Sequence, residues 1–121
     1  MLNFNSILLS TDNPKDVIAF YTNVFAKKPE WAEADWAGFQ VGGGFFSVGP
    51  HDKVKGKSKQ PERILFNFET TDVAHEFERI KKLGAKVIAK PYEMEGMDGM
   101  WIATFADPDG NYFQLMSPMK G

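Results

Sequence analysis

Hydrophobic positions along this chain follow two spacings, and the same succession of spacings occurs twice. Residues 3–10 combine polar and apolar residues at the spacing of a strand. Four apolar residues then recur three or four positions apart: Val17, Phe20, Tyr21 and Val24. This second spacing predicts one apolar face of a helix. Asp12 or Asn13 can cap that helix, and Pro14 suits its first turn.

The second copy of this succession begins at residue 63. A strand is predicted over residues 63–69, and Thr71-Asp72 then precedes a second helix. The core-facing positions of that helix are Val73, Phe77, Ile80 and the stem of Lys81. Leu83-Gly84 ends the helix, because glycine readily takes the left-handed conformation that terminates helices.

Three extended segments follow each helix, so each half of the chain is predicted to be a βαβββ module. In the first module they cover residues 29–34, 36–41 and 45–49, and Gly42-Gly43-Gly44 forms the turn between the last two. In the second module they cover residues 86–90, 100–106 and 111–117. We therefore expect an α+β fold in a single domain of residues 1–121, with module one at about 1–50, a linker at about 51–61 and module two at about 62–121.

The segment Asp107-Pro108-Asp109-Gly110-Asn111 predicts a hairpin turn before the last strand. Pro108 presets the first corner of a type I turn, and Gly110 takes the left-handed conformation that returns the chain. Because side chains alternate along a strand, one face is expected to carry Tyr112, Gln114 and Met116, and the other Phe113 and Leu115.

Composition excludes several classes of function. The chain has 121 residues, of which 43% are hydrophobic and 25% charged, which is typical of a globular domain with a buried core. Its net charge of −2 gives no general attraction for nucleic acid or for an anionic membrane. The absence of cysteine excludes disulfides and thiolate chemistry. Residues 1–10 have neither a basic leader nor a long apolar run, so we expect a cytoplasmic protein.

Lysines occupy every second position of the linker: Lys53, Lys55, Lys57 and Lys59. Such a run favours a solvated linker or an edge segment. The alternative is a basic flap that attracts an anionic ligand.

The paired modules, Asp12 with Phe20-Tyr21 in the first helix, and the Asp-Pro-Asp-Gly-Asn turn together resemble one protein superfamily. It is the glyoxalase, bleomycin-resistance and extradiol dioxygenase superfamily, whose fold is called vicinal oxygen chelate. The resemblance covers essentially the whole chain and implies that the two modules form a cleft-shaped mixed sheet. It leaves the function open, because the superfamily contains isomerases, ring-cleaving dioxygenases, resistance enzymes and drug-binding proteins.

Enzymes of this superfamily usually hold one divalent metal ion with ligands on the first strand of each module and the last strand of the second. Those positions fall here on Asn5, Leu65 and Gln114, and an optional fourth falls near Ser47. Two neutral amides and a leucine do not replace the hydration of a divalent ion. We therefore expect no functional metal at these positions, and no other cofactor.

Other residues offer little to rebuild a metal or catalytic centre. His75 is expected on the solvent side of its helix, and His51-Asp52 is a weak pair in a loop. The acidic residues Glu93, Glu95 and Asp98 are expected to be solvated. No Gly-x-Ser-x-Gly motif is present, so a hydrolytic triad has no support.

The predicted cleft is lined by a mixture of apolar and amide side chains. We expect its ligand-binding residues to be Asn5, Ile7, Arg63, Leu65, Asn67, Trp101, Tyr112, Gln114 and Met116. Trp31 and Trp36 can flank it beside Trp101 and stack on flat or cationic ligands, or they can fill a core or a dimer interface. A methionine-containing loop offers an adaptable rim or further core filling: Met94, Met97 and Met100.

These features favour a metal-independent binding protein of the bleomycin-resistance type that sequesters a small hydrophobic or amphipathic molecule. The resemblance also implies a homodimer. One alternative is a glyoxalase I-like lyase or a dioxygenase with Asn5 and Gln114 as atypical metal ligands. Another is a metal-free lyase or isomerase that uses Tyr112 or Arg63.

Overall fold

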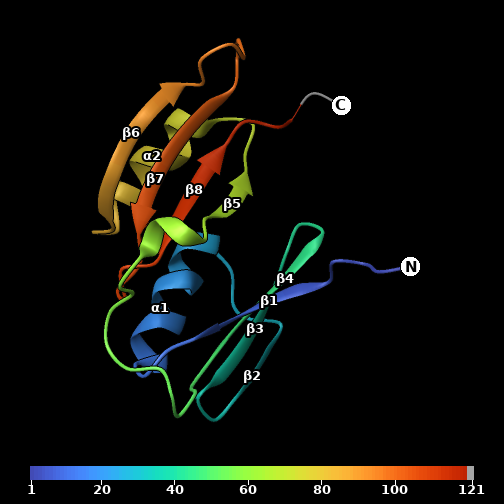
Figure 1. Cartoon of the computed structure of the whole chain (residues 1–121), viewed down its shortest axis with the longest axis vertical. Helices are drawn as coiled ribbons and strands as arrows, with labels where there is room; N and C mark the ends of the chain where they lie inside the picture. Colours follow the sequence, from blue (N-terminus) through green and yellow to red (C-terminus); the bar gives the residue numbers. More distant parts are fainter. Residues whose placement is uncertain (120–121) are drawn as a thin grey trace. The chain divides into compact units, whose positions relative to one another are not determined.

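The structure is a computed structural model, and it describes residues 1–119. The chain divides into two compact units, Met1–Gly56 and Lys57–Gly121. Each unit contains one βαβββ module, as the sequence predicts (Figure 1). None of the helices within residues 1–119 has the length and apolar composition needed to cross a membrane.

The first unit is a four-stranded mixed sheet with one helix. Its elements are β1 (Ser6–Ser10), α1 (Pro14–Phe25), β2 (Trp31–Glu33), β3 (Trp36–Val41) and β4 (Gly44–Gly49). The strands lie in the order β1-β4-β3-β2, with β1 and β4 parallel and the other pairs antiparallel. Val41 pairs with Gly44, and Gly42 has φ +56°, so the predicted glycine turn closes this hairpin.

Helix α1 packs on this sheet through its predicted apolar face. Its buried residues are Val17, Tyr21 and Val24. The ring centroid of Tyr21 lies 4.8 Å from that of Phe46 on β4. Asn13 occupies the N-cap position without a side-chain capping bond, and the carboxylate of Asp12 instead accepts a hydrogen bond from the Gly56 N–H at 3.0 Å. The capping bond expected from Asp12 or Asn13 is therefore not formed.

The second unit repeats the topology. Its elements are the 3-10 helix η1 (Pro61–Arg63), β5 (Phe66–Glu69), α2 (Val73–Lys82), β6 (Lys86–Glu93), β7 (Trp101–Ala106) and β8 (Tyr112–Met116). The strands lie in the order β5-β8-β7-β6, again with one parallel pair, β5 and β8.

Helix α2 covers one face of the second sheet. Its buried residues are Val73, Phe77 and Ile80, as predicted, whereas Lys81 is exposed. The Phe77 ring stacks on Phe105 of β7, with centroids 5.2 Å apart. Asp72 caps the helix by accepting a hydrogen bond from the His75 N–H at 3.0 Å, and His75 is exposed as expected.

The turn before β8 is built around the side chain of Asp107. One carboxylate oxygen accepts hydrogen bonds from the N–H groups of Asp109 and Asn111, both at 2.9 Å. Gly110 has φ +81°, and its N–H donates to the Asp107 carbonyl at 2.9 Å. The predicted turn is confirmed.

Three predicted strand boundaries are wrong by three residues, and the others differ by two at most. Strand β1 begins at Ser6 and not at Asn3, because its first pair with β4 is Ser6 with Phe45, and β4 itself begins only one residue before Phe45, at the glycine hairpin. Arg63 lies in η1 and not in a strand. Strand β6 runs on to Glu93, three residues beyond the predicted end at residue 90.

The lysines of the linker are exposed, as a solvated segment requires. One of them contacts the second unit, to which it belongs: the ammonium group of Lys57 donates a hydrogen bond to the carbonyl of Pro108.

Candidate functional site

The face of the second sheet opposite α2 carries the polar side chains around Gln114. Phe113 and Leu115 of β8 are buried on the α2 side, so Tyr112, Gln114 and Met116 point to the other side, as predicted. The strand registers place Asn67 of β5 and Thr104 of β7 directly beside Gln114. We call this surface the amide face and define it by Asn67, Thr104, Tyr112, Gln114 and Met116.

A row of three polar groups crosses the amide face. The side-chain nitrogen of Gln114 donates a hydrogen bond to the hydroxyl of Thr104 at 3.1 Å. Thr104 is 5% exposed, whereas Gln114 is half-buried and Asn67 is exposed. Because neighbouring strands lie about 4.8 Å apart, the row spans about 10 Å. Tyr112 and Met116 flank it along β8 with apolar surface.

The structure thus brings together four of the predicted ligand-binding residues: Asn67, Tyr112, Gln114 and Met116. Leu65 lies one residue before β5 and is 39% exposed. Arg63 in η1 donates a hydrogen bond to the side-chain oxygen of Gln60 at 2.8 Å. Neither of these two residues belongs to a strand of the sheet.

Trp101 lies on the opposite face of the sheet from Gln114, so the predicted grouping of the two in one ligand-binding lining is wrong. Ile102 pairs with Met116, so Ile102 shares the amide face, and Trp101 points with Phe105 to the α2 side. The sequence did not indicate this because, apart from Thr104, both sets of alternating positions in β7 are apolar.

Two of the predicted ligand-binding residues belong to the first unit. Asn5 precedes β1 and is exposed. Ile7 pairs with Phe46, whose ring contacts Tyr21 of α1, so Ile7 faces the helix and not a ligand surface. The expectation that Ile7 lines a binding cleft is therefore wrong. Leu8, which alternates with it, faces the other side and is 57% exposed.

A second surface, which the sequence identified only in part, lies on the face of the first sheet opposite α1. We call it the aromatic face and define it by Trp31, Trp36 and Phe45. Each of two strand glycines, Gly38 and Gly49, lies beneath an aromatic ring. A Cβ atom at Gly49 would lie 2.0 Å from the Trp36 ring, and one at Gly38 would lie 2.6 Å from the Phe45 ring. The signal in the sequence is a glycine inside a strand, which often marks close approach of another group.

The residues at the superfamily's metal-ligand positions do not fit a divalent ion. Leu65 has no donor atom, and Asn5 and Gln114 offer only neutral amides. The amide nitrogen of Gln114 is held by Thr104. Within residues 1–119, no three His, Asp or Glu side chains lie close enough together to hold a metal ion. This donor chemistry gives no basis for a step that runs through a metal.

Comparison with known proteins identifies the fold. Residues 6–116 match the model of the glyoxalase-like domain family. A glyoxalase/bleomycin resistance protein/dioxygenase family enzyme from Burkholderia phytofirmans PsJN superimposes with a TM-score of 0.76 and 18% identity, over 98% of this chain and 100% of that one. A glyoxalase-related enzyme from Fulvimarina pelagi gives 0.77 and 17%, over 98% and 89%.

The fosfomycin resistance protein of Listeria monocytogenes gives a TM-score of 0.65 and 21% identity, over 98% of this chain and 93% of that one. No curated protein matches this sequence. At such identities the structural likeness establishes the fold, and the chemistry has to come from the residues themselves.

Proposed function

The chain belongs to the glyoxalase-like domain family, and we propose that it binds a small hydrophobic or amphipathic molecule on its amide face without a metal ion. Family membership supports a ligand-binding role in general. The donor chemistry described above supports the metal-independent form of that role.

The observation that carries this proposal is the row of Asn67, Gln114 and Thr104 across three adjacent strands. Ligand sites are mostly apolar, with a few placed polar groups that fix orientation. Tyr112 and Met116 supply the apolar contact here, and the amides of Gln114 and Asn67 supply hydrogen bonds. The bond to Thr104 holds the Gln114 amide in one orientation before a ligand arrives, which reduces the entropy lost on binding.

Sequestration is favoured over catalysis by the kind of groups on this face. Amide and hydroxyl side chains hydrogen-bond a ligand but do not exchange protons with it near neutral pH. Tyr112 adds a phenol hydroxyl, which likewise serves as a hydrogen-bond donor and acceptor. We therefore propose that the protein holds its ligand unchanged.

A titration with the amphipathic fluorophore 1-anilinonaphthalene-8-sulfonate tests this proposal, followed by displacement with a panel of amphipathic drug-like molecules. We expect Gln114→Ala to weaken the tightest displacer about three- to tenfold, because one hydrogen bond contributes about 0.5–1.5 kcal/mol. Gln60→Ala is the matched control, since it removes an exposed amide of the same unit outside the amide face. Equal affinities of the Gln114 and Gln60 variants would contradict the proposed site.

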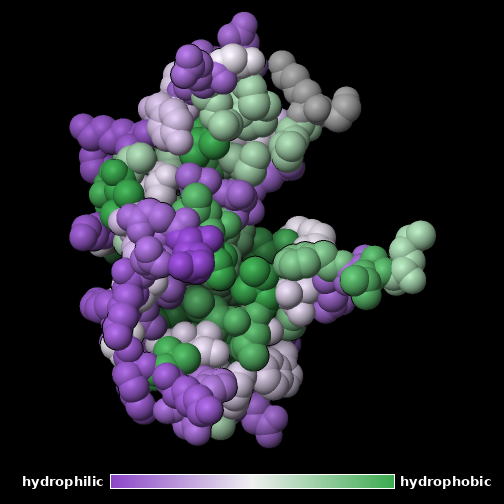
Figure 2. Space-filling view, in the orientation of Figure 1, coloured by the Kyte–Doolittle hydropathy of each residue, from purple (hydrophilic) through white to green (hydrophobic). Residues whose placement is uncertain are grey.

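We also propose that the chain forms a homodimer. The N-terminal segment before β1 exposes Leu2 and Phe4, which are 100% and 86% accessible. Figure 2 shows this segment, at the end marked N in Figure 1, with hydrophobic surface exposed along it. Burial of such side chains against a second copy would stabilise the pair.

Sedimentation equilibrium tests this assembly, with one chain contributing 13.6 kDa. We expect a species of twice that mass, and the double substitution Leu2→Ser with Phe4→Ser is expected to shift it toward the single chain. A parent protein that sediments as a single chain at micromolar concentration would refute the proposal.

A further inference from the structure

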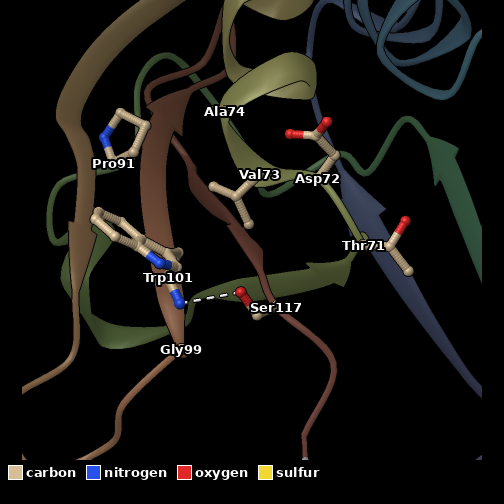
Figure 3. A pocket seen from close by; sticks show the side chains of 8 residues that line it. All are labelled: Thr71, Asp72, Val73, Ala74, Pro91, Gly99, Trp101 and Ser117. Carbon is tan, nitrogen blue, oxygen red and sulfur yellow. Dashed lines mark hydrogen bonds between the residues drawn. The ribbon is translucent and has the colours of Figure 1, made fainter.

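A pocket of about 340 Å³ lies on the α2 side of the second sheet, away from the amide face. It is lined by Thr71, Asp72, Val73, Ala74, Pro91, Gly99, Trp101 and Ser117. Figure 3 shows Pro91 and Trp101 on one side of this space and the start of α2 on the other. Its volume is within the range of sites for small molecules. The pocket lies on the opposite face of β7 from Thr104 and Gln114.

An irregularity in the sheet forms one wall of the pocket. Strands β6 and β7 change register between Ala89 and Tyr92, and Pro91 lies within this shift. Proline has no N–H to donate, so it is confined to edge strands and bulges, and β6 is an edge strand. Bulges change the direction of side chains and are common beside functional sites. The register shift between β6 and β7 thus occurs at the residue whose ring forms part of the pocket wall, Pro91.

Hydrogen bonds to Ser117 hold the backbone of Trp101 beside this wall. The Trp101 N–H donates to the Ser117 hydroxyl at 3.0 Å (Figure 3). The Ser117 N–H donates back to the Trp101 carbonyl at 3.0 Å. The loop beside it is held by the Gly99 N–H, which donates to the carboxylate of Glu93 at 2.8 Å. Trp101 nevertheless remains 43% exposed. A positioned but exposed indole is a ready surface for stacking.

The charges around the pocket determine which ligand it favours. Asp72 is the one charged residue among the eight that line the described pocket, and Glu93 adds a second carboxylate beside Gly99. The N-terminus of α2 is already occupied, because the His75 N–H donates to the Asp72 side chain and the Glu76 N–H to the Asp72 carbonyl. An anion bound at this end of the helix would lie beside the like charge of the Asp72 carboxylate. The pocket therefore favours a cation over an anion.

We propose that this pocket binds a small organic cation with an apolar body, such as an arylalkyl ammonium ion. The apolar body packs against Trp101 and Pro91, and the positive charge is attracted by the indole face and by the Asp72 carboxylate. Cation–π contact with tryptophan is the strongest of its kind, and a nearby carboxylate adds to it. This site is independent of the amide face and of any ligand bound there.

Isothermal titration calorimetry with three related probes tests the proposal: benzyltrimethylammonium, benzyl alcohol and benzoate. We expect the cation to bind at least fivefold more tightly than the alcohol, and benzoate to bind most weakly. Asp72→Asn is the informative variant, because asparagine caps a helix as well as aspartate does and removes only the charge. It should weaken the cation at least fivefold and leave benzyl alcohol unchanged.

Glu78→Gln is the matched control, since it removes an exposed carboxylate from the same helix outside the pocket. Trp101→Leu should weaken both the cation and the alcohol. In an amide NMR spectrum the cation should change the chemical shifts of the Gly99 and Trp101 amides and leave that of the Gln114 side-chain amide unchanged. This result would distinguish the pocket from the amide face. The proposal is overturned if the cation binds no better than benzoate, or if Asp72→Asn and Glu78→Gln weaken it equally.

Discussion

Replacement of Gly49 by alanine should displace the Trp36 ring and destabilise the first unit. The added Cβ would lie 2.0, 2.2 and 2.4 Å from the ring atoms Cε3, Cζ3 and Cδ2 of Trp36. Carbon atoms in contact lie about 3.5–4.0 Å apart, so the ring has to move by about 1.5 Å. Overpacking of this kind costs about 1–3 kcal/mol. Gly49 has no positive φ, so backbone strain does not contribute to the expected loss.

Urea unfolding followed by far-ultraviolet circular dichroism measures this loss, and tryptophan fluorescence of the native protein reports the movement of the ring. Gly43→Ala is the matched control, because nothing lies within 4 Å of its added Cβ and its φ is also not positive. We expect the control to retain or slightly exceed the parent stability. If Gly49→Ala is as stable as Gly43→Ala and has the parent's fluorescence, Trp36 does not rest on Gly49 and the aromatic face is wrongly described.

Substitutions at two further positions test the turn and the surface charges. Asp107→Ala should lower the free energy of unfolding by roughly 2–4 kcal/mol, because two backbone N–H groups, of Asp109 and Asn111, lose a charged acceptor in a buried turn. Asp107→Asn keeps one acceptor oxygen and should cost roughly half as much in the same urea titration. A hydrogen bond from Lys27 lowers the pKa of Glu30 below its ordinary value of 4.5. The stability that this carboxylate contributes is therefore complete above pH 4.5, and it is lost as the pH falls through the lowered pKa. The stability difference between the parent and Glu30→Gln should therefore shrink in acid, and a difference that grows below pH 4.5 would contradict this assignment.

Local chemistry was sufficient to predict much of the fold. The turn at Asp107 forms because a carboxylate, a proline and a glycine occupy the positions that the turn requires, and no distant residue has to be known. The face of α2 was equally clear, since Val73, Phe77 and Ile80 recur at helical spacing between exposed charges.

The ends of strands depend on their partners and were predicted less well. Asn5 continues the pattern of β1, but the pairing with β4 starts only at Ser6, and Gly44, the β4 residue opposite Asn5, closes the glycine hairpin by pairing with Val41. Arg63 likewise precedes the first pair between β5 and β8, which joins Phe66 and Phe113. A sequence pattern carries no record of where the neighbouring strand stops.

The faces of uniformly apolar strands were not predictable either. Ile7, Leu8 and Leu9 are all apolar, so alternation alone does not tell which of them packs on α1. The same ambiguity in β7 led to the wrong side for Trp101. The pocket at Pro91 was beyond prediction, because it depends on a register shift that only the pairing of β6 with β7 reveals.

Metal analysis of the purified protein tests most directly the central claim that Gln114 belongs to a neutral binding surface that holds no metal ion. Elemental analysis is combined with thermal unfolding after addition of nickel, zinc, manganese or ferrous ions. With Leu65 at one ligand position and neutral Asn5 and Gln114 at the others, we predict far less than one metal ion per chain and an unchanged midpoint of unfolding. One metal ion per chain, with an increase of several degrees in the midpoint that Gln114→Ala abolishes, would contradict the claim.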